Sequence, residues 1–150
     1  MHPNLNFDQI TESIFLGSYL EPGDWHILAA LGITANINLM AERRDMFTSS
    51  APEIHLWLPC ADLFAPNVHQ MRLGAKYIDL LITEGRKLYI HCHSGVGRSP
   101  LMVAAYFVYT GMSAKDAFAQ VKERRPVSRA SKQQVANLVE FAQQWADTRP

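Results

Sequence analysis

The chain has 150 residues, of which 48% are hydrophobic and 19% are charged, and its 14 Lys and Arg residues balance 14 Asp and Glu residues. These values are typical of one soluble globular domain, expected to cover residues 1–150, and the zero net charge argues against broad, non-specific binding to nucleic acid. The chain has two cysteines, and no signal peptide is visible in residues 1–6, so we expect a cytoplasmic protein. No apolar run approaches the roughly 20 residues that span a bilayer, so no membrane span is expected.

The first forty residues are predicted to form short strands and one helix. Apolar residues indicate short strands within residues 10–17. Residues 24–31 have the pattern of a short helix, which Gly32 would stop. Apolar residues then alternate with polar ones over residues 33–39, and this period of two predicts a strand.

The middle of the chain repeats this order of strand and helix. Residues 54–58 alternate as a strand does, and Pro59 is expected to end that strand. Apolar residues at helical spacing predict a helix over residues 68–82, with Gly85 as its stop. Residues 88–91 are the next predicted strand.

The last third is predicted to be helical. Residues 101–109 are apolar nearly all round, so this helix should be buried. Amphipathic patterns predict two more helices, over residues 114–121 with Ser113 as N-cap and over residues 135–145. Strands that interleave with helices, followed by helices alone, predict a single α/β domain with a central, mostly parallel sheet flanked by helices.

A glycine-bearing loop between the strand predicted at residues 88–91 and the buried helix is the most informative segment. This phosphate loop, residues 92–98, begins with Cys92 and ends with Arg98. Its amides and the helix N-terminus supply partial positive charge, which should lower the pKa of the thiol and make Cys92 a nucleophile. Arg98 offers a planar guanidinium that can bind two phosphate oxygens. The amides expected to surround the phosphate belong to His93, Ser94, Gly95, Val96 and Gly97.

Two neighbours of the phosphate loop have predicted supporting roles. Ser99 can donate its hydroxyl to the sulfur of Cys92 and help the thiolate to leave. His91 is expected to point to the other face of the strand and to hold the loop by hydrogen bonds. A metal site at residues 91–93 is not expected, because adjacent strand residues point to opposite faces.

A proton donor for the leaving oxygen is also required. The best candidate is Asp62, which lies just past the predicted strand at residues 54–58 and hence on the same edge of the sheet as Cys92. Asp79 falls within a helical pattern and Asp45 within a polar loop, so both are weaker candidates. We refer to residues 61–66 as the acid loop.

The motif formed by His91, Cys92, Gly95, Arg98 and Ser99 resembles that of the cysteine-based protein tyrosine phosphatase superfamily, and the short chain resembles its small dual-specificity branch. The similarity covers nearly all of the chain. Weaker flanking matches lie at residues 14–18, at residues 31–39, at Pro59 with Asp62, and at Arg125 with Pro126.

The resemblance implies a reaction in two steps without a metal or other cofactor. Cys92 would attack phosphorus to form a cysteinyl-phosphate while Asp62 protonates the leaving oxygen. Water would then hydrolyse the intermediate with Asp62 as base. Arg98 and the loop amides would stabilise charge on the phosphoryl oxygens in both steps.

The same resemblance implies a substrate class. The chain lacks the additional length of the tyrosine-specific enzymes, which implies a shallow pocket. Such a pocket should admit phosphoserine and phosphothreonine as well as phosphotyrosine in a phosphorylated protein. The chain is expected to be a monomer. The interior of the phosphate loop has no lysine, which disfavours a phospholipid. Other phosphatase substrates (a phosphoinositide, a nucleotide or an RNA 5′ end), a phospho-binding module and a rhodanese-type sulfurtransferase are the alternatives. Pro100 departs from the family pattern but is tolerated in a first helical turn.

Two further features have both a structural and a functional interpretation. Cys60 is either a small buried apolar residue or the partner of Cys92 in a reversible disulfide. The basic residues between 122 and 132 are either a solvated surface, or they include an active-site cation that favours acidic substrates, with Arg125 and Arg129 as candidates.

Overall fold

The computed structural model describes residues 5–148; residues 1–4 and 149–150, including most of the N-terminal segment considered above, lie outside the described residues. One five-stranded sheet has the order β1-β2-β5-β3-β4, in which only β1 is antiparallel to its neighbour. The strands are β1 Phe7–Gln9, β2 Ile14–Gly17, β3 Ile33–Met40, β4 Ile54–Cys60 and β5 Lys87–His91. The predicted α/β fold with a mostly parallel central sheet is therefore confirmed.

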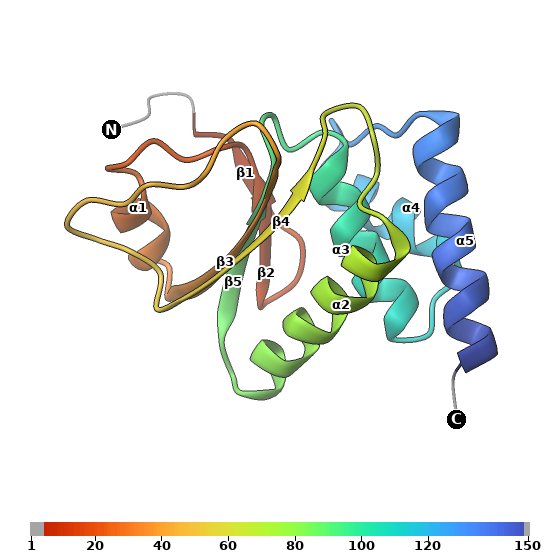
Figure 1. Ribbon diagram of the computed structural model, residues 1–150. Helices are drawn as coiled ribbons and strands as arrows, with labels where there is room; N and C mark the ends of the chain where they lie inside the picture. Colours follow the sequence, from red (N-terminus) through yellow and green to blue (C-terminus); the bar gives the residue numbers. More distant parts are fainter. Residues whose placement is uncertain (1–4, 149–150) are drawn as a thin grey trace.

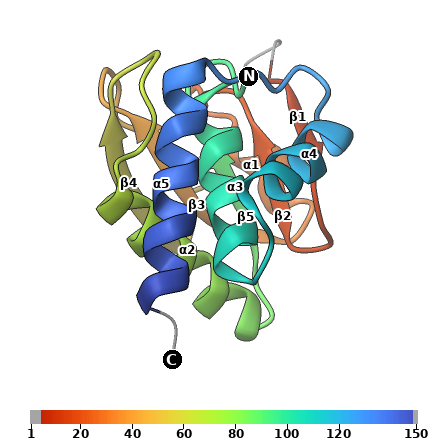
Figure 2. The ribbon, with the colours of Figure 1, turned by 90° about the vertical axis from the view of Figure 1, so that its right-hand side faces the viewer.

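Helices cover both faces of this sheet. Helices α2 to α5 lie on one face and α1 lies on the other (Figure 1). Turned by 90°, the molecule shows α3, α4 and α5 in front of the strands (Figure 2). The helices are α1 Trp25–Ala29, α2 Val68–Thr83, α3 Arg98–Tyr109, α4 Ala114–Arg124 and α5 Lys132–Thr148. Within residues 5–148, none of them is both long enough and apolar enough to cross a bilayer.

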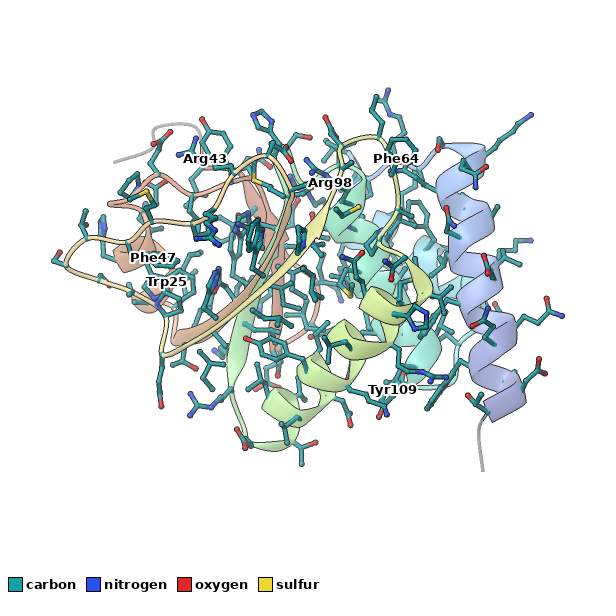
Figure 3. All side chains as sticks on the ribbon, viewed as in Figure 1. Trp25, Arg43, Phe47, Phe64, Arg98 and Tyr109 are labelled. Carbon is teal, nitrogen blue, oxygen red and sulfur yellow. The ribbon has the colours of Figure 1, made fainter. Side chains whose placement is uncertain are left out.

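Two hydrophobic clusters lie on the two faces of the sheet. The larger one fills the space between the sheet and α2 to α5, and the smaller one packs Trp25 of α1 against the opposite face. In Figure 3, Trp25 and Phe47 lie on the α1 side, whereas Arg98 lies near the carboxyl ends of the parallel strands. The expected buried helix is α3: ten of its twelve residues are buried, so it is a rigid support for the loop before it.

The end of β4 differs from the sequence-based prediction. Pro59 lies inside β4 instead of ending it, which is tolerated because β4 is an edge strand and one side of its backbone needs no ladder partner. Helix α3 starts at Arg98, so Pro100 lies in its first turn, as expected from the sequence.

The polar face of β3 is buried as well. Asn36 and Asn38 are both 0% exposed. Asn38 donates from Nδ2 to the carbonyl of Arg43 at 2.9 Å, and its Oδ1 accepts from the amide of Met40 at 2.8 Å. These bonds hold the start of the long connection between β3 and β4, and so decide which side chains this connection brings to the site.

Candidate active site

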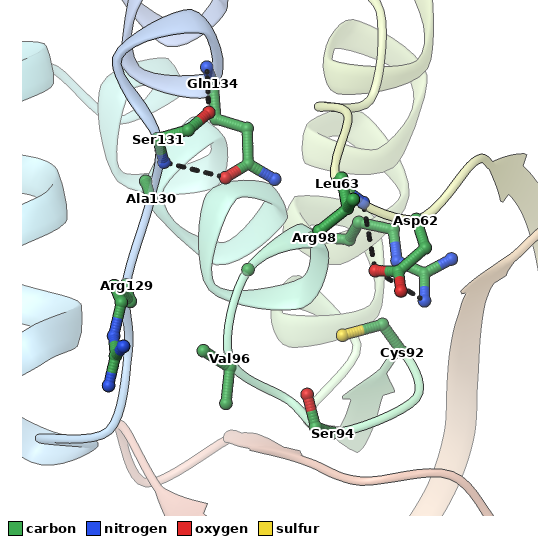
Figure 4. A pocket seen from close by; sticks show the side chains of 11 residues that line it. Asp62, Leu63, Cys92, Ser94, Val96, Arg98, Arg129, Ala130, Ser131 and Gln134 are labelled. Carbon is green, nitrogen blue, oxygen red and sulfur yellow. Dashed lines mark hydrogen bonds and ion pairs between the residues drawn. The ribbon is translucent and has the colours of Figure 1, made fainter.

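The site lies where the parallel strands end. Cys92 follows β5, which pairs in parallel with β2 on one side and β3 on the other, so its thiol lies at the carboxyl edge of the sheet. The phosphate loop then leads into α3. A cavity of about 400 Å³ opens above it, and Figure 4 shows Cys92, Arg98 and Asp62 together on its wall.

Gly95 is required by the path of the loop. Its φ is +71°, a left-handed value that residues with a Cβ rarely adopt. A Cβ at this position would also lie 2.6 Å from the backbone of Gly17 and 2.8 Å from Nη2 of Arg125. Gly97 has an ordinary φ of −119°, and a Cβ there would lie 3.3 Å from the side-chain nitrogen Nε2 of Gln134. The first glycine therefore shapes the backbone, whereas the second leaves space for a neighbour.

Arg125 holds the phosphate loop from behind. Its side chain is 1% exposed, and it donates from Nε to the carbonyl of Gly95 at 2.7 Å and from Nη2 to that of Ser94 at 3.1 Å. Its Nη1 pairs with Asp8 of β1 at 2.8 Å. With their carbonyls bound outward, the loop residues can turn their amides inward. Of the two arginines considered for the pocket mouth, Arg125 is thus a structural residue.

Cys92 and Ser99 are in contact. The thiol sulfur lies 3.2 Å from Oγ of Ser99, and the two residues are 2% and 0% exposed. His91 lies behind the loop, with Nδ1 3.3 Å from the carbonyl oxygen of Cys92. The predicted catalytic role of Ser99 and supporting role of His91 stay predictions, with geometry that permits both.

Arg98 is bound by a residue that the sequence interpretation missed. Its Nη1 and Nη2 donate to the two carboxylate oxygens of Glu42 at 2.7 and 2.9 Å, and Nη1 also donates to the carbonyl of Cys60 at 2.8 Å. The hydrogen bond from Arg98 lowers the pKa of Glu42 to about 2. Nε of Arg98 is buried without a partner among the described residues, so this donor remains for an anion. Glu42 follows the end of β3 as Asp62 follows β4, and that placement was the signal available in the sequence.

Asp62 lies where the sequence placed it, on the cavity wall. Its side chain is 69% exposed, and Oδ1 lies 3.5 Å from Nη2 of Arg98 and accepts from the amide of Leu63 at 2.9 Å. Leu63 has a φ of +72°, an uncommon value for a residue with a Cβ. Asp62 therefore projects toward the cavity from a tight turn, which is suitable for delivering a proton to a bound substrate.

Gln134 ties the acid loop to the far wall. Its side chain is 5% exposed, donates from Nε2 to the carbonyl of Phe64 at 3.0 Å and accepts from the amide of Ser131 at 2.9 Å. It therefore joins α5, the acid loop and the space beside Gly97. The sequence pattern over residues 135–145 began one residue later and gave no signal for Gln134.

The remaining loop residues divide into two groups. Ser94 and Val96 line the cavity, whereas the ring of His93 stacks on Tyr19 at 5.0 Å between centroids. Arg129 lines the opposite wall, and its amide donates to the carbonyl of Val96 at 2.8 Å. Phosphate binding by residues 93–97 stays a prediction. Arg129 is the candidate cation at the mouth.

Both cysteines are free and buried. Burial raises the pKa of the Cys60 thiol to about 11, so this thiol is protonated at neutral pH, with the carbonyl of Ala61 3.5 Å from its sulfur. The disulfide between Cys60 and Cys92 stays a prediction. Within residues 5–148, no three His, Cys, Asp or Glu side chains are grouped to hold a metal ion.

Comparisons with known proteins agree with this geometry. The family model for the dual specificity phosphatase catalytic domain matches residues 14–144. Dual specificity protein phosphatase 14 of Mus musculus is 31% identical over 139 residues, covering 91% of this chain and 69% of the relative. Dual specificity protein phosphatase 5 of Rattus norvegicus is 35% identical over 124 residues, covering 79% of this chain but 31% of the relative, so this chain spans about a third of that protein.

One similar protein is named for a lipid substrate, and two solved structures share the fold. Phosphatidylglycerophosphate phosphatase PTPMT2 of Arabidopsis thaliana is 32% identical over 126 residues, covering 80% of this chain and 55% of the relative. The crystal structure of PTPMT1 in complex with PI(5)P has a TM-score of 0.82 at 20% identity, covering 96% of this chain and 99% of that one. The crystal structure of human DUSP28 has a TM-score of 0.81 at 22% identity, covering 93% and 95%. At these identities the two structures support the fold alone.

Proposed function

The chain belongs to the dual-specificity phosphatase family, and on that premise we propose that it is a cysteine-dependent phosphatase acting on phosphotyrosine and on phosphoserine or phosphothreonine in proteins. The observation that carries the proposal is a single cavity lined by Cys92, Arg98 and Asp62. A nucleophile, an anion-binding guanidinium and a proton donor are the groups that phosphomonoester hydrolysis needs.

The proposed reaction has two displacements at phosphorus. Cys92 forms the S–P bond while the P–O bond to the leaving group breaks, and Asp62 gives its proton to that oxygen. A water molecule then attacks the cysteinyl-phosphate, Asp62 takes a proton from the water, and the thiolate leaves. Ser99, 3.2 Å from the sulfur, can donate its hydroxyl to the departing thiolate.

A protein substrate is favoured by the chemistry of the cavity wall. Among the described residues that line the cavity, Arg129 is the only basic residue besides Arg98. An inositol or glycerol phosphate headgroup with several charges would gain from more cations than this. Leu63 is 80% exposed and Phe64 61% exposed on the acid loop beside the cavity, which suits the apolar side chains that flank a phosphorylated residue in a peptide.

A phospholipid phosphatase is the second candidate, because the Arabidopsis thaliana relative is named for phosphatidylglycerophosphate. Measuring kcat/KM for phosphopeptides, phosphoinositides, phosphatidylglycerophosphate and nucleotides separates the two. We expect at least a tenfold preference for phosphopeptides. Preference for a lipid would reject the protein substrate and leave the reaction intact.

The reaction itself is tested with Cys92→Ser. This variant should lose hydrolysis of every substrate in the panel while still binding orthovanadate or phosphopeptide, since the loop amides and Arg98 are unchanged. If Cys92→Ser protein still turned over an aryl phosphate, the proposed nucleophile would be wrong. We further propose a monomeric, cytoplasmic protein, to be checked by light scattering and by cell fractionation.

A further inference from the structure

Two large apolar side chains on the acid loop form an apolar rim beside the cavity, made of Leu63 and Phe64. Leu63 is 80% exposed and Phe64 61% exposed, and with Met46 they are the three most exposed large hydrophobic residues in the described part of the chain. Leu63 lines the cavity (Figure 4), and Phe64 lies at the same end of the molecule as Arg98 (Figure 3). A single exposed leucine is ordinary, whereas two adjacent apolar side chains at a cavity indicate a binding surface.

The apolar rim is held on a tight turn that leucine fits poorly. The amide of Phe64 donates to the carbonyl of Ala61 at 3.2 Å, which closes a four-residue turn. Leu63 is the third residue of this turn and has a φ of +72°, a conformation that favours glycine or asparagine. Leu63 therefore combines an unfavourable backbone conformation with an apolar side chain in water, and neither is compensated by burial in the core. Conflicts of this kind are concentrated at functional sites.

The backbone beneath the apolar rim is fixed to the rest of the molecule. The carbonyl of Phe64 accepts from Nε2 of Gln134 at 3.0 Å and lies 3.6 Å from the sulfur of Cys60. Gln134 is itself 5% exposed, so this anchor belongs to the protein interior. A surface that is already ordered loses less conformational entropy on binding than a loose loop does. The two side chains are therefore presented to a ligand in a preorganised position.

The geometry favours one occupant of the apolar rim, the segment beside the phosphorylated residue of a protein substrate. Leu63 and Cys92 line the same cavity, so a phosphoryl group bound there would bring its flanking residues over the rim. A bilayer surface fits less well. Segments that bind anionic membrane surfaces combine apolar residues with Lys or Arg, whereas residues 61–66 contain Asp62 and no basic residue.

We propose that Leu63 and Phe64 are specificity-determining residues that bind an apolar side chain next to the phosphorylated residue of the substrate. The inference rests on the proposed function, because it assigns part of a protein substrate to a surface outside the phosphate loop. The contact lies away from phosphorus and forms equally in the ground state and in the transition state. It should therefore change KM rather than kcat.

The test uses pairs of phosphotyrosine peptides that differ in one residue, Leu or Gln, placed at each of the two positions on either side of the phosphotyrosine. Glutamine is the reference because it adds no charge that Arg129 could attract. In wild type, kcat/KM at one of these positions should be about tenfold higher for Leu, through a lower KM. In Leu63→Asn, which keeps a residue that tolerates positive φ, and in Phe64→Ser, the ratio should fall to about twofold or less.

The ratio is taken within each variant, so a change in the chemical step that is common to both peptides cancels. Met46→Gln is the matched control, because Met46 is 71% exposed and is not among the described residues that line the cavity. This variant should keep the wild-type ratio. A wild-type ratio near one at every position would overturn the proposal, as would a ratio that survives in both Leu63→Asn and Phe64→Ser.

A membrane-binding role of the apolar rim has its own outcome. If the same two variants lost hydrolysis of a phosphoinositide in phosphatidylcholine vesicles but kept the peptide ratio, the rim would bind lipid and the proposal would be rejected. Failure of the proposed function differs from failure of this inference. In the first case, all phosphopeptides would be poor substrates compared with lipids; in the second, they would be turned over equally well whatever their neighbouring residues.

Discussion

The ion pair between Glu42 and Arg98 makes a quantitative prediction for Glu42→Gln. The pKa of Glu42 falls from 4.5 to about 2, mainly because Arg98 donates to its carboxylate. At 1.36 kcal/mol per unit this sets an upper bound of about 3 kcal/mol. The Glu42 side chain is 43% exposed, so solvent screening leaves about 1 kcal/mol, or a fall in Tm of roughly 2–4 °C for a domain of this size.

The pH dependence of this loss identifies its cause. Because the folded-state pKa is depressed, the stabilisation by Glu42 is fully present above pH 4.5 and is lost as the pH falls through about 2. Linkage with these two values leaves about 40% of the stabilisation at pH 3. Glutamine in the variant does not titrate, so the difference in stability between wild type and Glu42→Gln should shrink to less than half between pH 7 and pH 3.

Urea unfolding at both pH values, followed by circular dichroism, measures the two differences. Glu53→Gln is the matched control, since it also removes a contact to both terminal nitrogens of an arginine, Arg86, but at an exposed position where a smaller loss is expected. A difference for Glu42→Gln that is as large at pH 3 as at pH 7 would refute the ion pair as its source. No difference at pH 7 would mean that Glu42 contributes nothing to holding Arg98.

Three further predictions concern the cavity. Asp62→Asn should lower kcat by roughly 10²- to 10⁴-fold for substrates with poor leaving groups, and much less for aryl phosphates with good leaving groups. A series of substituted phenyl phosphates measures this difference, and equal losses across the series would reject Asp62 as the acid. Gln134→Ala should release the acid loop and lower kcat about tenfold with the same leaving-group dependence, while Gln133→Ala on the exposed side of α5 should change neither. Mild peroxide treatment and peptide mapping should yield a disulfide between Cys60 and Cys92, and recovery of over-oxidised Cys92 with Cys60 always reduced would contradict that pairing.

Local sequence patterns predicted the fold and the loop that contains the nucleophile. Period-two and helical spacing located the parallel strands and the main helices, because one-sided burial leaves a regular trace in the sequence. The loop from Cys92 to Arg98 and the position of Asp62 after a strand were recognisable for a similar reason, since the residues after each parallel strand gather at the carboxyl edge of the sheet. Pro59 was placed wrongly, because tertiary context at an edge strand overrides local preference.

The residues that bind the phosphate loop and the acid loop could not be predicted from local sequence patterns. Arg125 binds Gly95 across thirty residues of sequence, and Gln134 binds Phe64 across seventy. No spacing rule connects such pairs, which meet only once the helices have packed. Glu42 also comes directly after a strand, so the reasoning that placed Asp62 at the edge of the sheet applies to it as well. It was missed because the guanidinium of Arg98 was assigned to phosphate, and no salt bridge to it was considered.

The connection after β3 brings two carboxylates to the site. Asn38 fixes its start by binding the carbonyl of Arg43. On either side of that bond, Glu42 reaches Arg98 at the cavity and Asp45 reaches His91 beneath the loop. One carboxylate therefore competes with phosphate for Arg98, while the other binds the histidine that precedes the nucleophile. A short segment anchored by a buried asparagine thus contacts the site at two points. Loosening it through Asn38 should lower stability, whereas removing Glu42 should change the binding of Arg98 alone.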